Sequence, residues 1–568
     1  MFIIQSNYGM YYGWCMNTIF ANNLQGNFMD GAVPESFGRY LMIFSNVLMF
    51  LYKHFPYIAW WGWTWFALNI FCISNFLFVI VVSSSLGWRN IFISITFSIL
   101  FVLSFCLEGF ILMDSTIGVI FLSCSSLLAL VVLWKTAKPS WHKYILGFFL
   151  AGLFYLALLI RFEVIPLSVV EAVILFIFLF PVRTNYVRVA KFFIFFGVCA
   201  ISWYATYRAL DNPEFAVDMK VDDRMNISEN LVHQSTLNTD KFWRAVMTNR
   251  FYGDNKITTL GASIPIKTEP WINLLRFENI KRKVLTEYWR STNLYNEYNP
   301  DLNYFGSILV LAASGLLLLF INFIGGVFSS TGFRPFVINI TLFSAFWLTM
   351  LAAAIFMRAD DRFLLPYDVC TIVCMLLVCL YQFKNQAAKN YILLLLSVVC
   401  ITIILCDRGS IQSIVETKKL EIQHANELKG YIHNHYKGKV IIFDFWTMSL
   451  FLGDPFINSG PDTTHIQLMY GDYGSSILSP YRNKIRSLTK KSDDLDDFLK
   501  YAATNDARFL LTDDRKNLFE RYSQEIYHRK FVLNAIDSTC PIYTYHFCAL
   551  PYRYNFGVYS CVDSSRSE

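Results

Sequence analysis

The segment RADDRFLLPYDV spans Arg358 to Val369, and four of its first five residues are charged. The apolar run VINITLFSAFWLTMLAAAIFM precedes it, and LLPYDVCTIVCMLLVCL overlaps its end. An apolar run of about 20 residues is long enough to cross a bilayer as a helix. The stretch therefore predicts two membrane helices joined by a short charged turn at the membrane surface.

The composition of the whole chain agrees with this prediction. Of its 568 residues, 55% are hydrophobic and only 16% are charged, and the mean hydropathy is +0.40. Soluble domains carry about 25% charged residues. The chain is therefore predicted to be a polytopic membrane protein, in contact with membrane lipid and with no nucleic-acid partner. Most cysteines lie in apolar runs, where we expect them to pack as small hydrophobic residues.

Further apolar segments predict about 10–11 transmembrane helices in all. The predicted spans are 57–83, 90–107, 109–133, 143–162, 164–181, 190–206, 304–324, 335–356, 365–383 and 390–406. A shorter apolar segment at 40–52 is expected to form a helix in the membrane interface. The first residues have no basic, apolar signal-peptide pattern, and they leave open whether a first helix precedes Met1 or is unusually polar.

The region after the last span is predicted to be a soluble α/β domain. KVIIFDFW and ARFLLTDD have strand patterns, and DDLDDFLKYAA has a helix pattern. The expected organisation has five parts: a first outer loop with its interfacial helix (1–56), an N-terminal transmembrane module (57–206), a large loop (207–303), a C-terminal transmembrane module (304–406) and the α/β domain (407–568).

Charges in the short connections predict the orientation. Alternate connections hold basic residues and no acid: Arg89, Lys135, Lys138, Lys143, Arg183, Arg188, Lys191, Arg334, Lys384 and Lys389. The positive-inside rule places these in the cytoplasm. Loop 207–303 and the α/β domain are then extracytoplasmic. Charges look scarce in the middle of the spans, so we expect any chemistry at the outer surface rather than within the membrane.

Two readings of the charged turn stay open on the residues alone. Arg358 and Arg362 lie at headgroup depth, where guanidinium groups can bind phosphate through paired hydrogen bonds. Ion pairs with Asp360 and Asp361 that end the two helices explain the same residues.

Three stretches resemble the GT-C membrane glycosyltransferases, which include mannosyltransferases, aminoarabinose transferases and phage-type glucosyltransferases. Asp361–Pro366, DRFLLP, resembles the family's PRYLLP segment, with Phe in place of Tyr and Asp before the Arg. Leu153–Val170 resembles the family's helix pair around LxRPxxLxL, although Pro166 comes later than the family's proline. Asp30–Pro56 resembles the first outer loop. The resemblance covers the membrane half in order and spacing, but not the insert 207–303.

The resemblance implies an inverting transferase at the outer face of a bacterial inner (plasma) membrane. Its donor would be a sugar on polyprenyl phosphate, and its acceptor a glycan, a lipid or a protein of the cell envelope. In the family, an acid of the first outer loop activates the acceptor hydroxyl. That role falls to Asp30, with Glu35 as the alternative.

The resemblance also assigns roles to residues further along the chain. Arg161, Arg358 and Arg362 would stabilise the charge of the departing phosphate. Asp114, with Glu108 before it, matches a second acid of the family. Asp114 beside Ser115 and Thr116 is equally well suited to cap a helix, and both readings stay open. If a divalent cation (Mg²⁺ or Mn²⁺) takes part, Asp30 and Asp114 would supply carboxylate ligands, but the sequence establishes no metal.

Two other functions are compatible with the sequence. An O-antigen polymerase or ligase would also have many helices and a large outer loop, but such proteins seldom carry an α/β domain after the last helix. A transporter of lipid-linked sugars would need buried polar residues or interrupted helices in corresponding places of two halves.

Overall fold

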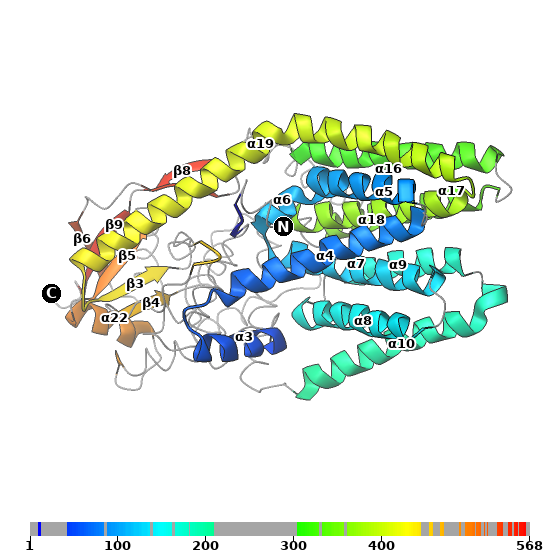
Figure 1. Ribbon diagram of the computed structural model, residues 1–568. Coiled ribbons are helices and arrows are strands. Elements are labelled where there is room, and N and C mark those ends of the chain that lie inside the picture. Colours follow the sequence, from blue (N-terminus) through cyan, green and yellow to red (C-terminus); the bar gives the residue numbers. More distant parts are fainter. Residues whose placement is uncertain are drawn as a thin grey trace. The chain divides into compact units, whose positions relative to one another are not determined.

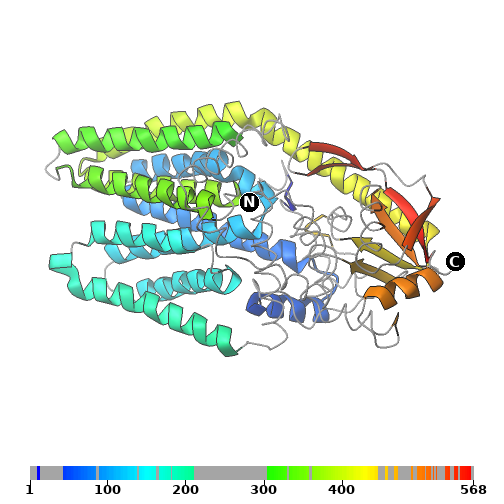
Figure 2. The same cartoon turned by 180° about the vertical axis from the view of Figure 1, so that it is seen from behind.

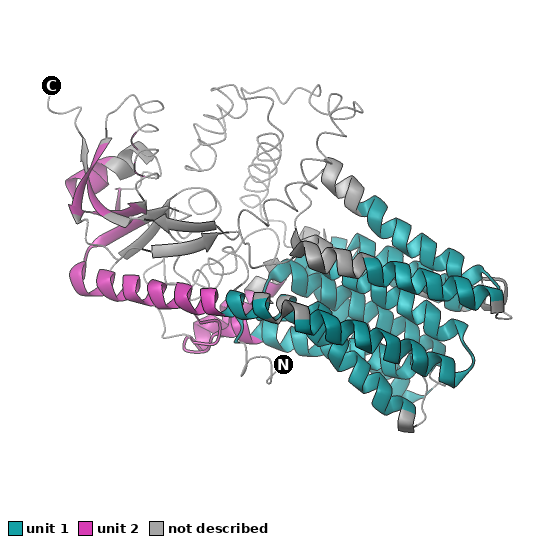
Figure 3. Ribbon diagram, turned by 90° about the horizontal axis from the view of Figure 1, so that it is seen from above, with its two compact units in different colours: residues 1–13, 64–210, 280–415 teal, residues 14–63, 211–279, 416–568 magenta. Residues whose placement is uncertain are grey.

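The computed structural model describes residues 9–12, 42–84, 88–136, 140–161, 165–180, 182–209, 304–328, 332–356, 361–444, 454–457, 466–470, 488–489, 495–505, 507–512, 516, 520, 531–537, 543–547, 550–554 and 556–563. The chain divides into two compact units, coloured separately in Figure 3. Unit 1 comprises residues 1–13, 64–210 and 280–415, and unit 2 comprises residues 14–63, 211–279 and 416–568.

Unit 1 is a bundle of helices that lie side by side with their axes roughly aligned (Figure 1; from behind in Figure 2). Its helices are α4 (Trp60–Ser84), α5 (Trp88–Phe101), α6 (Leu107–Ile111), α7 (Ser115–Thr136), α8 (Trp141–Arg161), α9 (Pro166–Leu179), α10 (Val182–Ala209), α16 (Tyr304–Phe328), α17 (Arg334–Phe356), α18 (Asp361–Gln382) and the first part of α19 (Gln386–His435). A π-helical turn, η2 (Val102–Cys106), joins α5 to α6.

Two helices form the centre of this bundle. Residues 116–133 of α7 and 366–380 of α18 are all buried. The helices around them, such as α8, α10 and α16, expose large apolar side chains, including Phe148, Ile201 and Phe320. An apolar surface of this kind is suited to lipid contact. Among the described residues, four helical segments are long and apolar enough to cross a membrane: Trp60–Ser84, Ser115–Thr136, Trp141–Arg161 and Gln386–Leu405.

Every segment predicted to be a membrane helix is largely helical, although several boundaries differ. Two of the differences change the local structure. The first difference concerns the turn expected at Glu108. The helix continues through Glu108 to Ile111, and the turn comes at β2 (Leu112–Met113), because Asp114 starts the next helix. Strand β1 (Tyr11–Tyr12) pairs with β2 in parallel, which brings this N-terminal stretch beside the start of α7.

The second difference concerns the last predicted span, which was expected to end at about residue 406. Helix α19 instead continues to His435 without a break. The sequence after Leu405 loses its apolar character but contains no proline, so the helix continues after the hydropathy falls. Its residues belong to unit 1 up to Val415 and to unit 2 from Glu416.

A close approach between α4 and α7 depends on a glycine. A Cβ atom on Gly118 would lie 2.9 Å from Cζ3 of Trp65, whose side chain is buried. A side chain at this position would therefore push the two helices apart. Gly118 lies in the first turns of α7, so this packing helps to fix the end of α7 where Asp114 and Thr116 lie.

Unit 2 contains an α/β fold, as the sequence predicted for the C-terminal region. Its main sheet has the strand order β4-β3-β5-β9-β6. The strands are β3 (Val440–Asp444), β4 (Ile466–Tyr470), β5 (Arg508–Thr512), β6 (Phe531–Asp537) and β9 (Phe556–Asp563). Strand β3 is parallel to β4 and β5, and β9 is antiparallel to β5 and β6. The two predicted strands and the predicted helix, α22 (Leu495–Thr504), are confirmed.

The rest of unit 2 includes a small hairpin and an N-terminal helix. Strands β7 (Tyr543–Phe547) and β8 (Leu550–Tyr554) form the antiparallel hairpin. The segment predicted to be an interfacial helix is helical as α3 (Met42–His54). The buried Tyr52 of α3 accepts a hydrogen bond from the backbone of Trp61 through its hydroxyl, at 2.9 Å.

Candidate functional site

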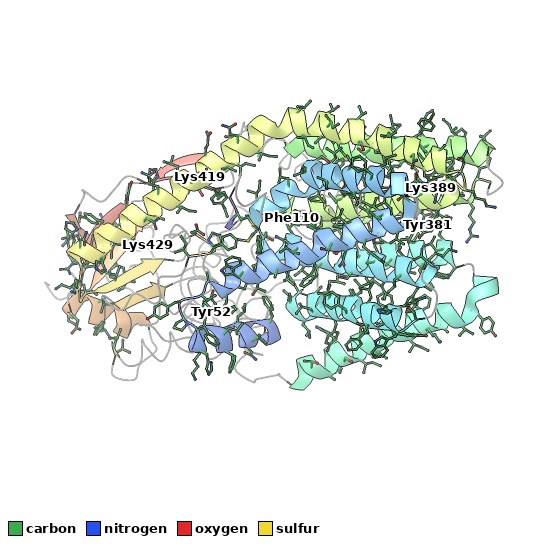
Figure 4. The ribbon with its side chains drawn as sticks, in the orientation of Figure 1. Tyr52, Phe110, Tyr381, Lys389, Lys419 and Lys429 are labelled. Carbon is green, nitrogen blue, oxygen red and sulfur yellow. The ribbon has the colours of Figure 1, made fainter. Side chains whose placement is uncertain are left out.

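The two ends of the helical bundle in unit 1 carry different charged groups. Helix α7 begins, α8 ends, and α9 and α18 begin at one end, which we call the acidic end; its named side chains are Asp114, Arg161, Glu171, Tyr367 and Asp368. The opposite end, called the basic end, contains Lys135, Arg334 and Lys389. In Figure 4, Phe110 marks the side of the acidic end, and Tyr381 and Lys389 mark the basic end.

Asp114 caps the first turn of α7. Its Oδ1 accepts hydrogen bonds from the backbone N–H of Thr116 at 2.7 Å and of Ile117 at 3.3 Å. These N–H groups have no partner within the helix, so a carboxylate here stabilises the helix start. The side chain is only 4% exposed. Of the two readings left open by the sequence, the capping arrangement is the one found, and Asp114 precedes the helix rather than lying just inside it.

Arg161 approaches the same turn of α7 from the end of α8. Its Nη1 donates a hydrogen bond to the hydroxyl of Thr116. Asp114 and Arg161, two residues singled out by the sequence, therefore meet at Thr116. The Asp114 carboxylate already accepts from the first N–H groups of the turn, so the guanidinium group of Arg161 is the part of the turn that would attract a further anion.

Glu171 lies deeper in the bundle, on α9. It is fully buried, and its Oε1 is hydrogen-bonded to the hydroxyl of Thr371 on α18. Its Oε2 accepts a weak contact from the Cys124 thiol of α7 at 3.9 Å. Glu171 therefore joins the three helices α7, α9 and α18 at one point. A rise of about 1.5 Å per residue places it about 8 Å along α9 from Pro166.

Asp368 and Tyr367 complete the polar interior of the acidic end. Both side chains are 5% exposed and belong to α18. The Asp368 carboxyl group is near enough to Glu171 for an electrostatic interaction, and Tyr367 interacts in the same way with Arg161.

Hydroxyl and amide groups extend this polar interior along α7. Ser123 and Ser168 share a hydrogen bond of 3.1 Å between α7 and α9. The Asn75 amide of α4 donates to Ser125 at 3.4 Å and to Ser126 at 3.3 Å. Polar contacts of this kind hold apolar helices together where lipid provides no hydrophobic driving force between them.

The basic end uses its cations differently. Lys135 donates to the carbonyl of Leu179 at 2.9 Å, and Lys389 donates to that of Ser83 at 3.1 Å. Arg334 approaches the carbonyls of Ile177 and Phe178, at 3.4 and 3.5 Å. All of these carbonyls belong to the last turns of α4 or α9, where no intrahelical donor remains. The three cations therefore cap helix ends.

The structure describes only part of the predicted site. Asp30, Glu35 and Arg358 lie outside the described residues. Glu108 belongs to α6 and Arg362 to the first turn of α18, but their side chains are not among those described. Of the predicted residues, the structure brings together Asp114 and Arg161.

Glu171 and Asp368 are the residues that sequence reasoning missed. Both lie inside predicted spans, 164–181 and 365–383, so the expectation that charges are scarce there overlooked them. The signal was present, because an ionisable residue inside an apolar span is by itself a sign of a functional site. Which other residues surround them depends on helix packing, which periodicity does not reveal.

No metal centre is found in the described part of the chain. There, no group of three or more His, Cys, Asp or Glu side chains is arranged to hold a metal ion. Cys124, Cys370 and Cys374 are buried near one another, and Glu171 approaches Cys124. Their burial agrees with the expected packing role of these cysteines.

No protein-family model, curated protein or solved structure matches the chain.

Proposed function

We propose that the chain is a membrane glycosyltransferase of the GT-C type. In this proposal it moves a sugar from a polyprenyl-phosphate donor to a glycan, lipid or protein acceptor of the cell envelope. The reaction takes place at the outer face of the bacterial inner membrane, and the acidic end of unit 1 faces outward. The basic end then faces the cytoplasm, in agreement with the positive-inside rule.

The observation that carries the proposal is the pairing of Arg161 with the first turn of α7. The guanidinium group donates to Thr116, whose backbone N–H is itself held by Asp114. A guanidinium group can bind phosphate through paired hydrogen bonds. Because the turn ends a helix long and apolar enough to cross a membrane, the phosphate suited to it belongs to a lipid.

The chemistry of the proposed reaction assigns further roles. The acceptor hydroxyl loses its proton to Asp30 as its oxygen attacks the anomeric carbon, and Glu35 is the alternative base. The bond from that carbon to the phosphate oxygen breaks, and Arg161, Arg358 and Arg362 stabilise the charge on the departing polyprenyl phosphate. Strand β1 supports an N-terminal contribution, because it pairs with β2 directly before Asp114.

The second acid has a narrower role in this proposal. We assign Asp114 to hold the first turn of α7, and through it Thr116, in place. Should Mg²⁺ or Mn²⁺ take part, Asp30 and Asp114 would be its carboxylate ligands, and the cation would help to neutralise the phosphate. Glu108 is the other acid near this turn in sequence.

A transfer assay on the full chain in lipid nanodiscs tests the proposal. The donors are polyprenyl phosphates that carry one labelled glucose, mannose or aminoarabinose, and the acceptor is an envelope extract. We expect Asp30→Asn to abolish transfer from the accepted donor without a change in thermal unfolding, and Glu35→Gln to retain it. Transfer that survives both substitutions would refute the assigned base. Activity with lipid-linked oligosaccharides but not with single sugars would instead identify a polymerase or ligase.

One observation favours a second function, transport of a lipid-linked sugar. Transporters place ionisable groups inside the membrane, and Glu171 is fully buried in α9. Vesicles that contain the chain discriminate between the two functions. Movement of the labelled donor across the bilayer without any transfer product would support transport and contradict the glycosyltransferase.

A further inference from the structure

Two carboxyl groups inside the bundle have no role in the proposed transfer reaction. Glu171 is fully buried on α9, and Asp368 is 5% exposed on α18. Glu171 is hydrogen-bonded to Thr371, and Asp368 lies three residues before Thr371 on α18, so the two acids are neighbours across α9 and α18. At a rise of about 1.5 Å per residue, they lie about 8 and 10 Å along their helices from the acidic end. Two ionised carboxylates this close in apolar surroundings would repel each other and lack solvation.

The helices packed around Glu171 do not supply a compensating positive charge. The titratable or hydroxyl groups near it come from α7 and α18: Cys124, Tyr367, Asp368, Cys370, Thr371 and Cys374. On α17, Arg334 lies at the other end of α9, on the carbonyls of Ile177 and Phe178. Arg161 of α8 is bonded to Thr116. Within the described chain, no cation pairs with Glu171.

The hydroxyl of Thr371 indicates where a proton lies. Its Oγ1 is 2.9 Å from the backbone carbonyl of Tyr367 and is also hydrogen-bonded to Glu171 Oε1. A carbonyl can only accept, and a hydroxyl group has one hydrogen to donate. If the hydroxyl donates to the carbonyl, as threonines in helices commonly do, the second bond needs a hydrogen from Glu171. Both bonds are satisfied together when Glu171 is the neutral acid.

Asp368 supplies an independent observation. Although it is almost fully buried, it makes no hydrogen bond or ion pair with any residue that the structure describes. A buried polar group normally has a partner, so a carboxyl group without one calls for a water, an ion or a proton there. Its electrostatic neighbour is Glu171, and the smallest ligand that relieves two adjacent carboxyl groups is a proton.

We infer that Glu171 and Asp368 form a proton-binding site within the bundle. The pair holds a proton at neutral pH, Glu171 carries it, and Asp368 is the neighbouring acceptor. Loss of the proton leaves a charge at the contact of α7, α9 and α18. Proton release therefore requires that water or a cation enters, or that α9 shifts against α18. This site is separate from the donor turn at Thr116 and does not depend on the transfer reaction.

Infrared spectroscopy of the full chain in nanodiscs tests the inference directly. A protonated carboxylic acid has a C=O stretching band that a carboxylate lacks. We expect this band in the wild-type chain at neutral pH and its loss in Glu171→Gln, which keeps the size and neutrality of the side chain. In Asp368→Asn the band should persist at a shifted frequency, because a neighbour of Glu171 has changed.

Glu421 offers a matched control. It is 1% exposed, like Glu171, but its carboxylate forms an ion pair with Lys418 at 2.8 Å. Glu421→Gln should therefore leave the protonated band unchanged. A wild-type chain without the band, or a band that survives Glu171→Gln, would overturn the inference. A band lost only in Asp368→Asn would overturn the assignment of the proton to Glu171.

A second measurement covers the case in which Glu171→Gln does not fold. The wild-type chain is then prepared with ¹³C at the side-chain carboxyl of every glutamate. The protonated band should move to lower frequency, because a heavier carbon slows the vibration. A band that stays in place would belong to another residue type and would refute the proposal.

Discussion

The basic end and the acidic end of the bundle place their charged groups in opposite circumstances. At the basic end, Lys135, Arg334 and Lys389 all contact carbonyls in the last turns of neighbouring helices. At the acidic end, Glu171 and Asp368 are buried, and no cation of the described chain forms an ion pair with either. Cations beside helix C-termini complement the helix dipole, so packing alone explains the basic end.

This difference shows how charged groups in a membrane helix bundle can be interpreted. A charge that satisfies a backbone group needs no ligand, whereas a charge buried without an opposite partner needs one. Arg161 is an intermediate case, because it holds Thr116 and also lies at an anion-attracting turn. Substitutions at the two ends can distinguish charged groups that cap helices from charged groups that bind a ligand.

Arg161→Gln should produce the largest effect on function. A hydrogen bond to a charged group contributes about 1.5–3 kcal/mol, so we expect donor affinity to fall roughly 10- to 100-fold. The measurement is binding of a polyprenyl phosphate to the full chain in nanodiscs. Arg334→Gln at the basic end is the matched control and should leave affinity unchanged. Equal losses in both variants would remove the functional distinction between the two ends.

Gly118→Ala should destabilise the acidic end by overpacking. The new Cβ would lie 2.9 Å from the Trp65 ring, and overpacking typically costs about 1–3 kcal/mol of unfolding free energy. Thermal unfolding in detergent measures the effect. Gly152→Ala on α8 is the control, since its Cβ would meet no atom within 4 Å. Similar unfolding of the two variants would show that α4 and α7 tolerate a wider separation.

Substitutions of Asp114 separate its two possible roles. Asp114→Ala should lower the unfolding free energy by about 1 kcal/mol, because the N–H groups of Thr116 and Ile117 lose their acceptor. Asp114→Asn retains a capping oxygen, so it should keep both stability and transfer activity. A stable Asp114→Asn variant that has lost transfer would instead make Asp114 the second acid implied by the family resemblance.

Lys389→Met should have a small effect that is confined to stability. It removes the hydrogen bond to the Ser83 carbonyl, worth about 0.5–1.5 kcal/mol of stability. Donor binding should not change, because the bond closes a helix end. Lys384→Met, at an exposed lysine nearby, should alter neither property. Reduced donor binding in Lys389→Met would contradict a purely structural basic end.

Much of the fold could be predicted from the sequence, because long apolar runs and strand patterns reflect local chemistry. The helices of unit 1 and the strands β3 and β5 illustrate this. The end of α19 could not be placed, since a drop in hydropathy marks the limit of a span and not of a helix. The contact of Arg161 with Thr116 depends on which helix ends are neighbours, which only the tertiary packing determines.

The most direct test of the difference between the ends is photo-crosslinking of a polyprenyl phosphate with a photoreactive group near its phosphate. The full chain in nanodiscs is irradiated, and mass spectrometry locates the labelled peptides. We predict labels around Thr116 and Arg161 that excess polyprenyl phosphate suppresses and that Arg161→Gln removes. Competed labels confined to the basic end, around Lys135 and Lys389, would contradict a lipid-phosphate site at the acidic end.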